Sequence, residues 1–214
     1  MAGLRESKKR RTREAIAQAA ADLFRDRGFA AVTIDDVARA AGVSRQTVFN
    51  YFPTKEQMLF DREDEIGAAL LALVRDRSDG VSLVDAFRGH TRAFWERFGR
   101  VLREGGEHHG FWEIVQANPA LRDYAESSFA RQARSVGEEL ARHRSLPPDD
   151  PICHAIARAL CGVNVVVLTC GLGRLTSGED HATVVPDMIE QAEAAYDLLE
   201  HGIGSHAPPG GLSL

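Results

Sequence analysis

The feature that most restricts the fold of this chain is the stretch AAGVSRQTVFNYFPTKE, residues 40–56, in which Gly42 separates two short segments of helical periodicity. Four apolar residues before the glycine follow the i, i+3, i+4, i+7 spacing of one helical face. They are Ile34, Val37, Ala38 and Ala41. After the glycine, Ser44 can cap a further helix that we expect to end near Phe52. Glycine tolerates the positive φ of a tight corner, so the stretch predicts a helix-turn-helix.

A longer helix is predicted ahead of this pair. Apolar residues fall at helical spacing over residues 12–27, and Gly28 stands where a helix commonly ends. Thr33 and Asp36 have the spacing of a capping box, with Asp in place of the usual Glu, and predict the start of the next helix. The three helices together make a small N-terminal domain, which we assign to residues 1–55.

The third predicted helix presents a polar surface. Val48 and Phe52 are four residues apart and are expected to anchor this helix in the core. The side chains expected on its open side are Arg45, Gln46, Thr47, Phe49 and Asn50. Such donors and acceptors near the start of a helix can read base edges in the major groove of DNA, where an α-helix fits. A helical hairpin with an ordinary polar face is the alternative.

The charge distribution favours a DNA-binding surface. Residues 1–55 carry 11 Lys and Arg against 6 Asp and Glu, whereas residues 56–214 carry 15 against 25. The run KKRRTR, residues 8–13, contributes five of those cations, although a frayed and solvated tail has the same composition. A basic head on an acidic body indicates that the head meets a polyanion.

From Thr33 the sequence reads TIDDVARAAGVSRQTVFNYFPTKEQML and resembles the DNA-binding domain of TetR-family transcriptional regulators over about residues 10–60. The AxxAGVS turn, the YF pair and the lysine and glutamate that follow carry the resemblance. The base-facing residues that it implies are Arg45, Gln46 and Thr47, and the phosphate-holding residues are Thr33, Tyr51 and Lys55. Ser44, Phe49 and Asn50 complete the predicted DNA-binding set. Most family members have tyrosine where this chain has Phe49, so the phosphate hydrogen bond often made by that hydroxyl cannot form.

The rest of the chain is also predicted to be helical, because no strand-like alternation of useful length occurs. A capping-box spacing predicts one uninterrupted helix over residues 54–77. We therefore expect an all-α chain of about nine helices. An N-terminal three-helix helix-turn-helix domain over residues 1–55 is followed by a larger helical ligand-binding and dimerisation domain over residues 56–203. The tail of residues 204–214, with APPGG, is predicted to be disordered.

The last two predicted helices differ from the others. Residues 151–175 are apolar on nearly every side, and residues 183–201 carry one apolar face. A helix that is apolar all round must be covered on all sides. The simplest cover is a second copy, as the final two helices pair in TetR-like proteins, and burial within one subunit is the alternative. The residues expected at the dimer interface are Val163, Val167, Val185, Met188, Ile189, Ala192, Tyr196 and Leu199.

The most apolar segment, residues 152–172, is interpreted as a buried helix rather than a membrane span, because it contains His154, Arg158 and Asn164. The three cysteines of the chain all lie in this segment without a CxxC pair, which favours a reducing cytosol over a disulfide framework. No signal peptide is recognised in residues 1–30. Together these observations predict a cytoplasmic protein that does not act in a membrane.

The resemblance also implies a small-molecule pocket in the larger domain. The candidate lining residues are Phe94, Trp95, Phe98, His108, Phe111, Trp112, Tyr124 and Asn164. Aromatic stripes at helical spacing more often belong to a core, and Asn164 can either meet a ligand or bond across a dimer. His108, His109 and Glu113 have a spacing that suits a metal ion or a pocket mouth, but so few ligands do not make a metal site. No metal and no cofactor is predicted.

The predicted function is that of a sequence-specific transcriptional regulator, a repressor that a small-molecule ligand releases from a palindromic DNA operator. Its predicted partners are double-stranded DNA, the ligand and a second copy of the chain. The alternatives are a DNA-binding architectural protein without an inducer and an all-α enzyme that uses His108, His109 and Glu113. The enzyme is disfavoured, because the chain has no GxSxG, HExxH or phosphate-loop pattern and the basic head would be unexplained.

Overall fold

The computed structural model of the chain describes residues 2–104 and 109–202. Ten α-helices and no strand occur in these residues, which confirms the prediction of an all-α fold. The helices are α1 (Ala2–Arg27), α2 (Ile34–Ala40), α3 (Arg45–Tyr51), α4 (Glu56–Leu59), α5 (Glu63–Arg75), α6 (Leu83–Arg103), α7 (His109–Ala117), α8 (Pro119–His143), α9 (Pro151–Thr176) and α10 (His181–His201).

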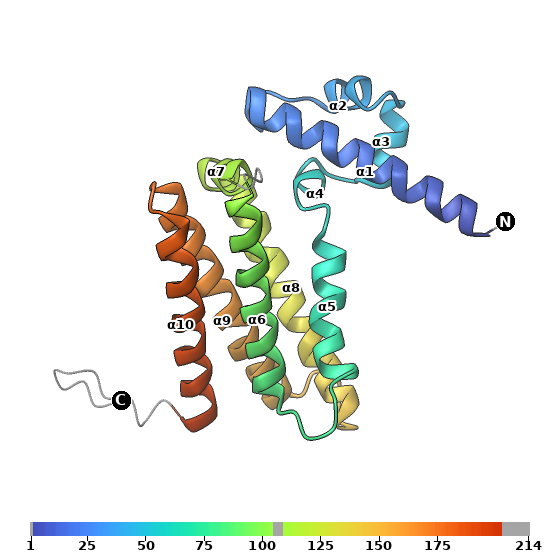
Figure 1. The fold of residues 1–214 in the computed structure, drawn as a ribbon. Coiled ribbons are helices and arrows are strands. Elements are labelled where there is room, and N and C mark those ends of the chain that lie inside the picture. The colour runs from blue at the N-terminus through green and yellow to red at the C-terminus, as the bar shows by residue number, and fades with distance from the viewer. Residues whose placement is uncertain (1, 105–108, 203–214) are drawn as a thin grey trace. The chain divides into compact units, whose positions relative to one another are not determined.

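The helices form two compact units, which Figure 1 shows in ribbon form. The first unit consists of α1 to α4, α7 and the start of α8 as far as Ala125. The second unit consists of α5 from Glu65 onward, α6, the rest of α8, α9 and α10. The first unit thus contains the predicted helix-turn-helix segment, and α7 joins it from a distant part of the sequence by packing on α1.

The first helix is longer than the sequence pattern predicts, since α1 begins at Ala2 instead of near Thr12. Its N-terminal part is polar, so no apolar periodicity marks it. Local contacts hold it instead: Arg10 pairs with Glu14 at 3.5 Å, and the Thr12 hydroxyl donates to the Lys8 carbonyl at 3.0 Å. The basic run of residues 8–13 therefore lies on a helix rather than on a frayed tail.

The single helix predicted over residues 54–77 is wrong, because the chain breaks there into α4 and α5. Phe60 ends α4 with φ −98° and ψ 38°, outside the helical region. The Asp61 carbonyl, which in an uninterrupted helix would accept from the backbone four residues on, accepts from Arg13 of α1 at 3.2 Å. This break raises the helix count from the predicted nine to ten in the described residues.

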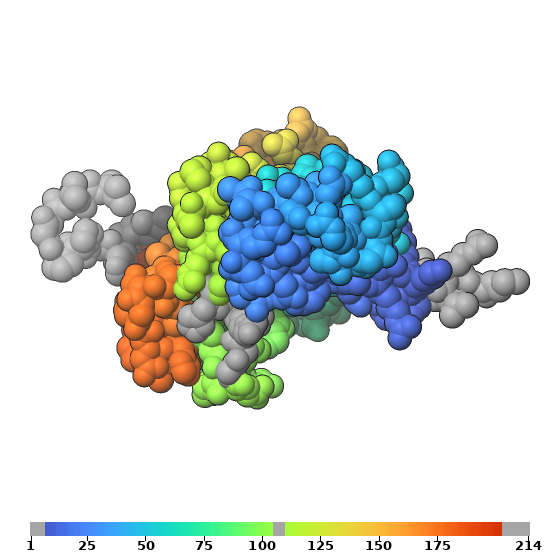
Figure 2. Space-filling model, turned by 90° about the horizontal axis from the view of Figure 1, so that it is seen from above, coloured from blue at the N-terminus to red at the C-terminus, as the bar shows by residue number. Residues whose placement is uncertain are grey.

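The core of the first unit holds α1, α2 and α3 together. Five of its apolar side chains have no exposed surface, and each contributes about 1.5–3 kcal/mol by burial. They are Ile16, Phe24, Val37, Val48 and Phe52. Seen from above, α1, α2 and α3 form one continuous surface, in blue to cyan in Figure 2. The exposed side chains of α3 thus stand on a packed support.

The second unit is organised around α6, α9 and α10, which pack on one another. Gly171 of α9 permits the closest approach, because a Cβ atom there would lie 2.3 Å from the Trp95 ring of α6 and 2.8 Å from Met188 of α10. Gly99 of α6 plays the same part against Val185 of α10, whose methyl group would lie 2.9 Å from an added Cβ. Small residues at these crossings fix how deeply the three helices interlock.

Helix α9 is long and apolar enough, by length and composition, to cross a membrane. A core helix of a soluble protein passes the same test. Within the chain, 28% of its most apolar window is buried, and Val166 on this helix is 60% exposed. Part of the apolar surface of α9 is therefore not covered by the other described residues of its own chain.

Candidate nucleic-acid interface

The start of α2 is fixed by Thr33 and Asp36, which form the predicted capping box. The backbone N–H of Asp36 donates to the Thr33 hydroxyl at 3.2 Å, and the Asp36 carboxylate accepts from the Thr33 hydroxyl at 2.7 Å and its backbone N–H at 3.0 Å. These hydrogen bonds hold the pKa of Asp36 well below its usual range, with a further contribution from Arg27. The helix thus begins at a defined residue.

The corner between α2 and α3 closes through Gly42. The N–H of Val43 donates to the Ala38 carbonyl at 3.0 Å and the N–H of Gly42 donates to the Arg39 carbonyl at 3.3 Å, a Schellman pattern. Gly42 has φ +66°, a conformation that residues with a Cβ atom rarely adopt. Ser44 then caps α3 by accepting from the Thr47 N–H at 3.1 Å. The predicted helix-turn-helix is confirmed in its caps and its turn.

The orientation of α3 follows from its buried side. Val48 and Phe52 are fully buried, as the periodicity predicts. The side chains of Ser44, Arg45, Gln46, Phe49 and Asn50 are exposed, and those of Thr47 and Tyr51 are half-buried. The structure therefore brings seven of the nine predicted DNA-binding residues together on or beside one surface of a short helix.

The polar side chains on α3 are already ordered by contacts with one another. Gln46 Nε2 donates to Asn50 Oδ1 at 3.1 Å, one helical turn away. Arg45 pairs with Asp35 of α2 at 2.9 Å, and its guanidinium lies 5.5 Å from the centre of the Phe49 ring. Preordered side chains lose less conformational entropy when they bind a partner.

Two residues that the resemblance assigns to phosphates have partners inside the protein. The Thr33 hydroxyl donates to Asp36, as described above. The Lys55 ammonium donates to the carbonyls of Phe29 at 2.7 Å and Val32 at 3.1 Å, and it lies 4.1 Å from the centre of the Phe29 ring. Burial lowers the pKa of Lys55. Lys55 thus links the loop before α2 to the start of α4 through hydrogen bonds that do not depend on DNA.

Sequence reasoning missed the role of Arg13, which it treated as one cation of a basic run. Its guanidinium lies 4.3 Å from the centre of the Phe52 ring and donates to the Tyr51 carbonyl at 3.0 Å and the Asp61 carbonyl at 3.2 Å. Arg13 therefore links α1 to the end of α3 and to the segment before α5. The available signal was its position three residues before the buried Ile16, which places it near the inner face of α1.

The candidate ligand residues fall into both compact units rather than one. On α6 in the second unit, the Phe94 and Phe98 rings stack at 5.8 Å and both meet Trp95 edge-on at 5.6 Å. In the first unit the Phe60 ring lies between Phe111 and Tyr124. Trp112 is buried in that same unit. His108 and the side chain of His109 lie outside the described part of the chain.

A buried polar group surrounds Asn164 in the second unit. The Thr91 hydroxyl lies within hydrogen-bond distance of Asn164 Oδ1 and 2.9 Å from the Tyr196 hydroxyl. Nδ2 of Asn164 is buried and makes no hydrogen bond to a described residue. Burial raises the pKa of Tyr196 to about 12, so this hydroxyl remains a neutral donor. Asn164 therefore contacts α6 of its own chain through Thr91, and Thr91 in turn contacts Tyr196 of α10.

The predicted dimerisation residues are divided by the structure. Val163, Ile189 and Leu199 are half-exposed. The other five are buried within their own subunit. They are Val167, Val185, Met188, Ala192 and Tyr196. The physical reason is that the apolar face of α10 packs on α6, an alternative that periodicity could not distinguish from packing on a partner.

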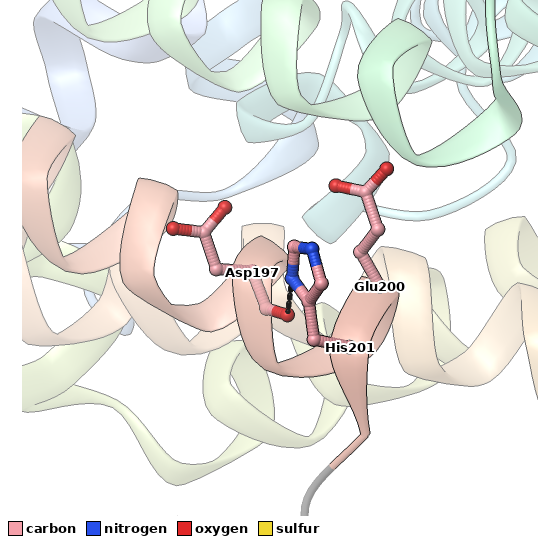
Figure 3. Close-up of side chains that lie close together, drawn as sticks. All are labelled: Asp197, Glu200 and His201. Carbon is pink, nitrogen blue, oxygen red and sulfur yellow. Dashed lines mark hydrogen bonds between the residues drawn. The ribbon is translucent and has the colours of Figure 1, made fainter. Parts of the chain in front are cut away.

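Three potential metal ligands converge near the end of α10, namely Asp197, Glu200 and His201 (Figure 3). The two carboxylates accept from Arg88 of α6 at 2.7 and 2.9 Å. Nδ1 of His201 lies 3.0 Å from the Asp197 carbonyl. Because Arg88 already pairs with both carboxylates, we interpret the cluster as an ion-pair contact between α6 and α10.

A capped turn between two short helices, with ordered polar side chains exposed on the second, is the geometry of a helix-turn-helix DNA-binding protein. Residues 16–61 match the family model described as bacterial regulatory proteins, tetR family. This part of the chain is therefore similar to the DNA-binding domain of the tetR family.

Similar proteins carry regulator names. The chain is 30% identical over 146 residues to the HTH-type transcriptional regulator TcmR of Streptomyces glaucescens, over 65% of this chain and 62% of TcmR. It is 30% identical over 127 residues to the HTH-type transcriptional repressor Rv3405c of Mycobacterium tuberculosis, over 59% of this chain and 64% of the repressor. Both matches span less than two thirds of the relative's length. The solved SmeT–triclosan complex shares the fold, with a TM-score of 0.55 at 20% identity over 93% of each chain.

Proposed function

We propose that this protein is a transcriptional repressor that recognises a palindromic DNA operator as a homodimer and leaves it when a small molecule binds. The observation that carries the proposal is the exposed, ordered polar surface of α3 on a basic N-terminal segment. The names of TcmR and Rv3405c, a regulator and a repressor, support the same function. The activity is one of binding, in the cytoplasm, rather than of catalysis.

The α3 surface supplies groups of the kinds that distinguish bases. With Gln46 Nε2 bound to Asn50 Oδ1, the Gln46 carbonyl oxygen and the Asn50 amide protons are left for base edges. Side-chain amides pair with adenine through one donor and one acceptor, and arginine pairs with guanine through two donors. Ser44 and Thr47 supply hydroxyl groups for the DNA backbone at the start of α3. Lys55, with two of its three donors used internally, keeps one for a phosphate.

A second copy is proposed to cover the exposed apolar side of α9. Val166 is 60% exposed, and Ala159 and Cys170, which lie on the same side at helical spacing, are also exposed. Half-exposed Val163 adjoins them. An uncovered apolar helix face of this kind marks an interface, and a two-fold dimer places two copies of α3 on half-sites about 34 to 36 Å apart or a multiple of that spacing.

The effector is proposed to bind in the second unit near the α6 aromatic cluster. Phe94, Trp95 and Phe98 offer an aromatic wall, and Asn164 offers a buried amide donor. SmeT, which shares the fold, has been solved in a complex with triclosan. Apolar walls with a few placed polar groups are typical of small-molecule sites.

The proposal is tested by selection from a random-sequence DNA library with the purified full chain at near-physiological salt. Enrichment of a shared palindrome is expected. If every sequence is recovered in proportion to its input, the protein binds DNA without reading it, and an architectural role replaces the proposed one.

A further inference from the structure

The first residue of α3 and the second residue of α2 are joined across the turn by an ion pair. Nη1 of Arg45 lies 2.9 Å from Oδ2 of Asp35. The two side chains are 60% and 56% exposed, so the pair lies on the surface that also carries Gln46 and Asn50. An exposed pair of this kind adds little to the stability of the free protein. Its placement on the DNA-facing surface is what requires an explanation.

A second contact restricts the orientation of the same guanidinium. The Arg45 guanidinium lies 5.5 Å from the centre of the Phe49 ring, one turn further along α3. Arginine stacks on aromatic faces, and phenylalanine adds no hydroxyl that could compete for the guanidinium or reach a phosphate. Asp35 and Phe49, from two different helices, therefore hold the arginine in one direction.

A carboxylate on a surface that approaches DNA repels the phosphates, which makes Asp35 costly unless it has a local purpose. Asp35 uses one side of the planar guanidinium fork, and a guanidinium carries five N–H donors. The remaining donors can still pair with the O6 and N7 acceptors of a guanine. At the same time the carboxylate satisfies the charge that would otherwise draw Arg45 to the nearest phosphate.

We propose that Asp35 is a specificity-determining residue that positions Arg45 for a guanine edge and withholds it from the phosphate backbone. This inference rests on the proposed function, because it requires a preferred DNA sequence. Asp35 itself does not contact a base in this arrangement. Its effect is on the direction in which Arg45 points, and therefore on the ratio of specific to non-specific binding.

The test uses the full chain and the DNA sequence that the wild-type protein selects. Affinities are measured for that sequence, for single base-pair changes in it and for mixed-sequence DNA, at several salt concentrations. The variants are Asp35→Asn, Arg45→Ala and the double variant. Asp35→Glu keeps the carboxylate. Asp22→Asn serves as the matched control, because it removes the acid of an exposed pair with Arg25 on α1, at 2.5 Å.

Asp35→Asn is expected to lower discrimination at one G·C base pair by about tenfold, within the range that a bidentate contact provides. It is expected to strengthen binding to mixed-sequence DNA, and to steepen the salt dependence by about 0.9 for one further phosphate contact. Arg45→Ala is expected to abolish discrimination at the same base pair, with no further loss in the double variant. Asp35→Glu retains most of the discrimination, and Asp22→Asn leaves it unchanged.

A merely structural role for Asp35 would weaken binding to all sequences alike and leave the discrimination ratio unchanged. That result overturns the inference while leaving the proposed function intact. Loss of discrimination in Asp35→Asn at a base pair that Arg45→Ala does not affect also overturns it. A wild-type protein that prefers no sequence would contradict the proposed function itself, so the two failures are distinguishable.

Discussion

Lys55→Met is the substitution that most clearly separates the internal role of Lys55 seen in the structure from the phosphate contact that the sequence resemblance implies. The ammonium of Lys55 donates to two backbone carbonyls, at 2.7 and 3.1 Å, and lies over the Phe29 ring. A hydrogen bond from a charged donor contributes about 1.5–3 kcal/mol when well buried, and a cation–π contact at an exposed site contributes about 0.5 kcal/mol. Because Lys55 is part-exposed, we take about 2 kcal/mol for the three contacts together.

Methionine keeps the apolar stem of the side chain and removes the three contacts. A loss of about 2 kcal/mol increases the opening equilibrium of the first unit by roughly 30-fold. Hydrogen exchange of the α1 and α2 amides under native conditions measures this opening directly. Lys9→Met is the control, because it removes the same charge from an exposed position on α1.

The expected result is faster exchange in Lys55→Met and unchanged exchange in Lys9→Met. Equal exchange rates in the two variants, with weaker DNA binding in Lys55→Met alone, would refute the reasoning. In that case Lys55 would act on DNA only, as the resemblance implies.

Three further predictions follow from particular contacts. Hydrogen bonds depress the pKa of Asp36 in the folded protein. The stability that the Asp36 carboxylate contributes is therefore present above about pH 4, its unfolded pKa, and is lost as the pH falls below that value. Thermal unfolding measured across pH should show this loss in the wild type and less of it in Asp36→Asn. Gly171→Ala places a Cβ 2.3 Å from a tryptophan ring carbon and should lower the free energy of unfolding by about 1–3 kcal/mol in chemical unfolding. Gly89→Ala, with open space around its Cβ, should raise it by about 0.5–1 kcal/mol. A change of the same sign in both variants would contradict the packing described. Val166→Glu should yield monomers in sedimentation, because it buries an unpaired charge in the proposed interface, while Val81→Glu, at another exposed valine, should not; an intact Val166→Glu dimer would remove this face from the interface.

The turn between α2 and α3 could be predicted because its determinants are local. The Thr33 and Asp36 capping box, the positive φ of Gly42 and the Ser44 cap each depend on residues at most five apart. Local signals of this kind remain visible in the sequence whatever the rest of the chain does.

The break between α4 and α5 could not be predicted, because the contact that stabilises it comes from a residue far away in the sequence. Arg13 occupies the Asp61 carbonyl across a separation of 48 residues, and no pattern near Asp61 signals this. The early start of α1 was missed for a different reason, since polar helical turns without a buried face carry no apolar periodicity.

The interface residues show a further limit of periodicity. An apolar face predicts that a helix is covered, but it does not predict whether the same subunit or a second copy covers it. Met188 and Tyr196 of α10 are buried by their own subunit, whereas Val166 of α9 is exposed. Only the packed structure separates the two cases, because periodicity identifies an apolar face without identifying what covers it.

The measurement that tests the central claim most directly is recovery of bound fragments from the source genome by the wild-type protein and by Gln46→Ala, at the same near-physiological salt. Gln46 is exposed on α3, and its loss leaves the buried side of the helix unchanged. The account predicts that the wild type recovers fragments sharing a palindrome and that the variant recovers a set with relaxed preference at one base pair in each half-site. Identical recovery by the two proteins would contradict recognition through this surface of α3.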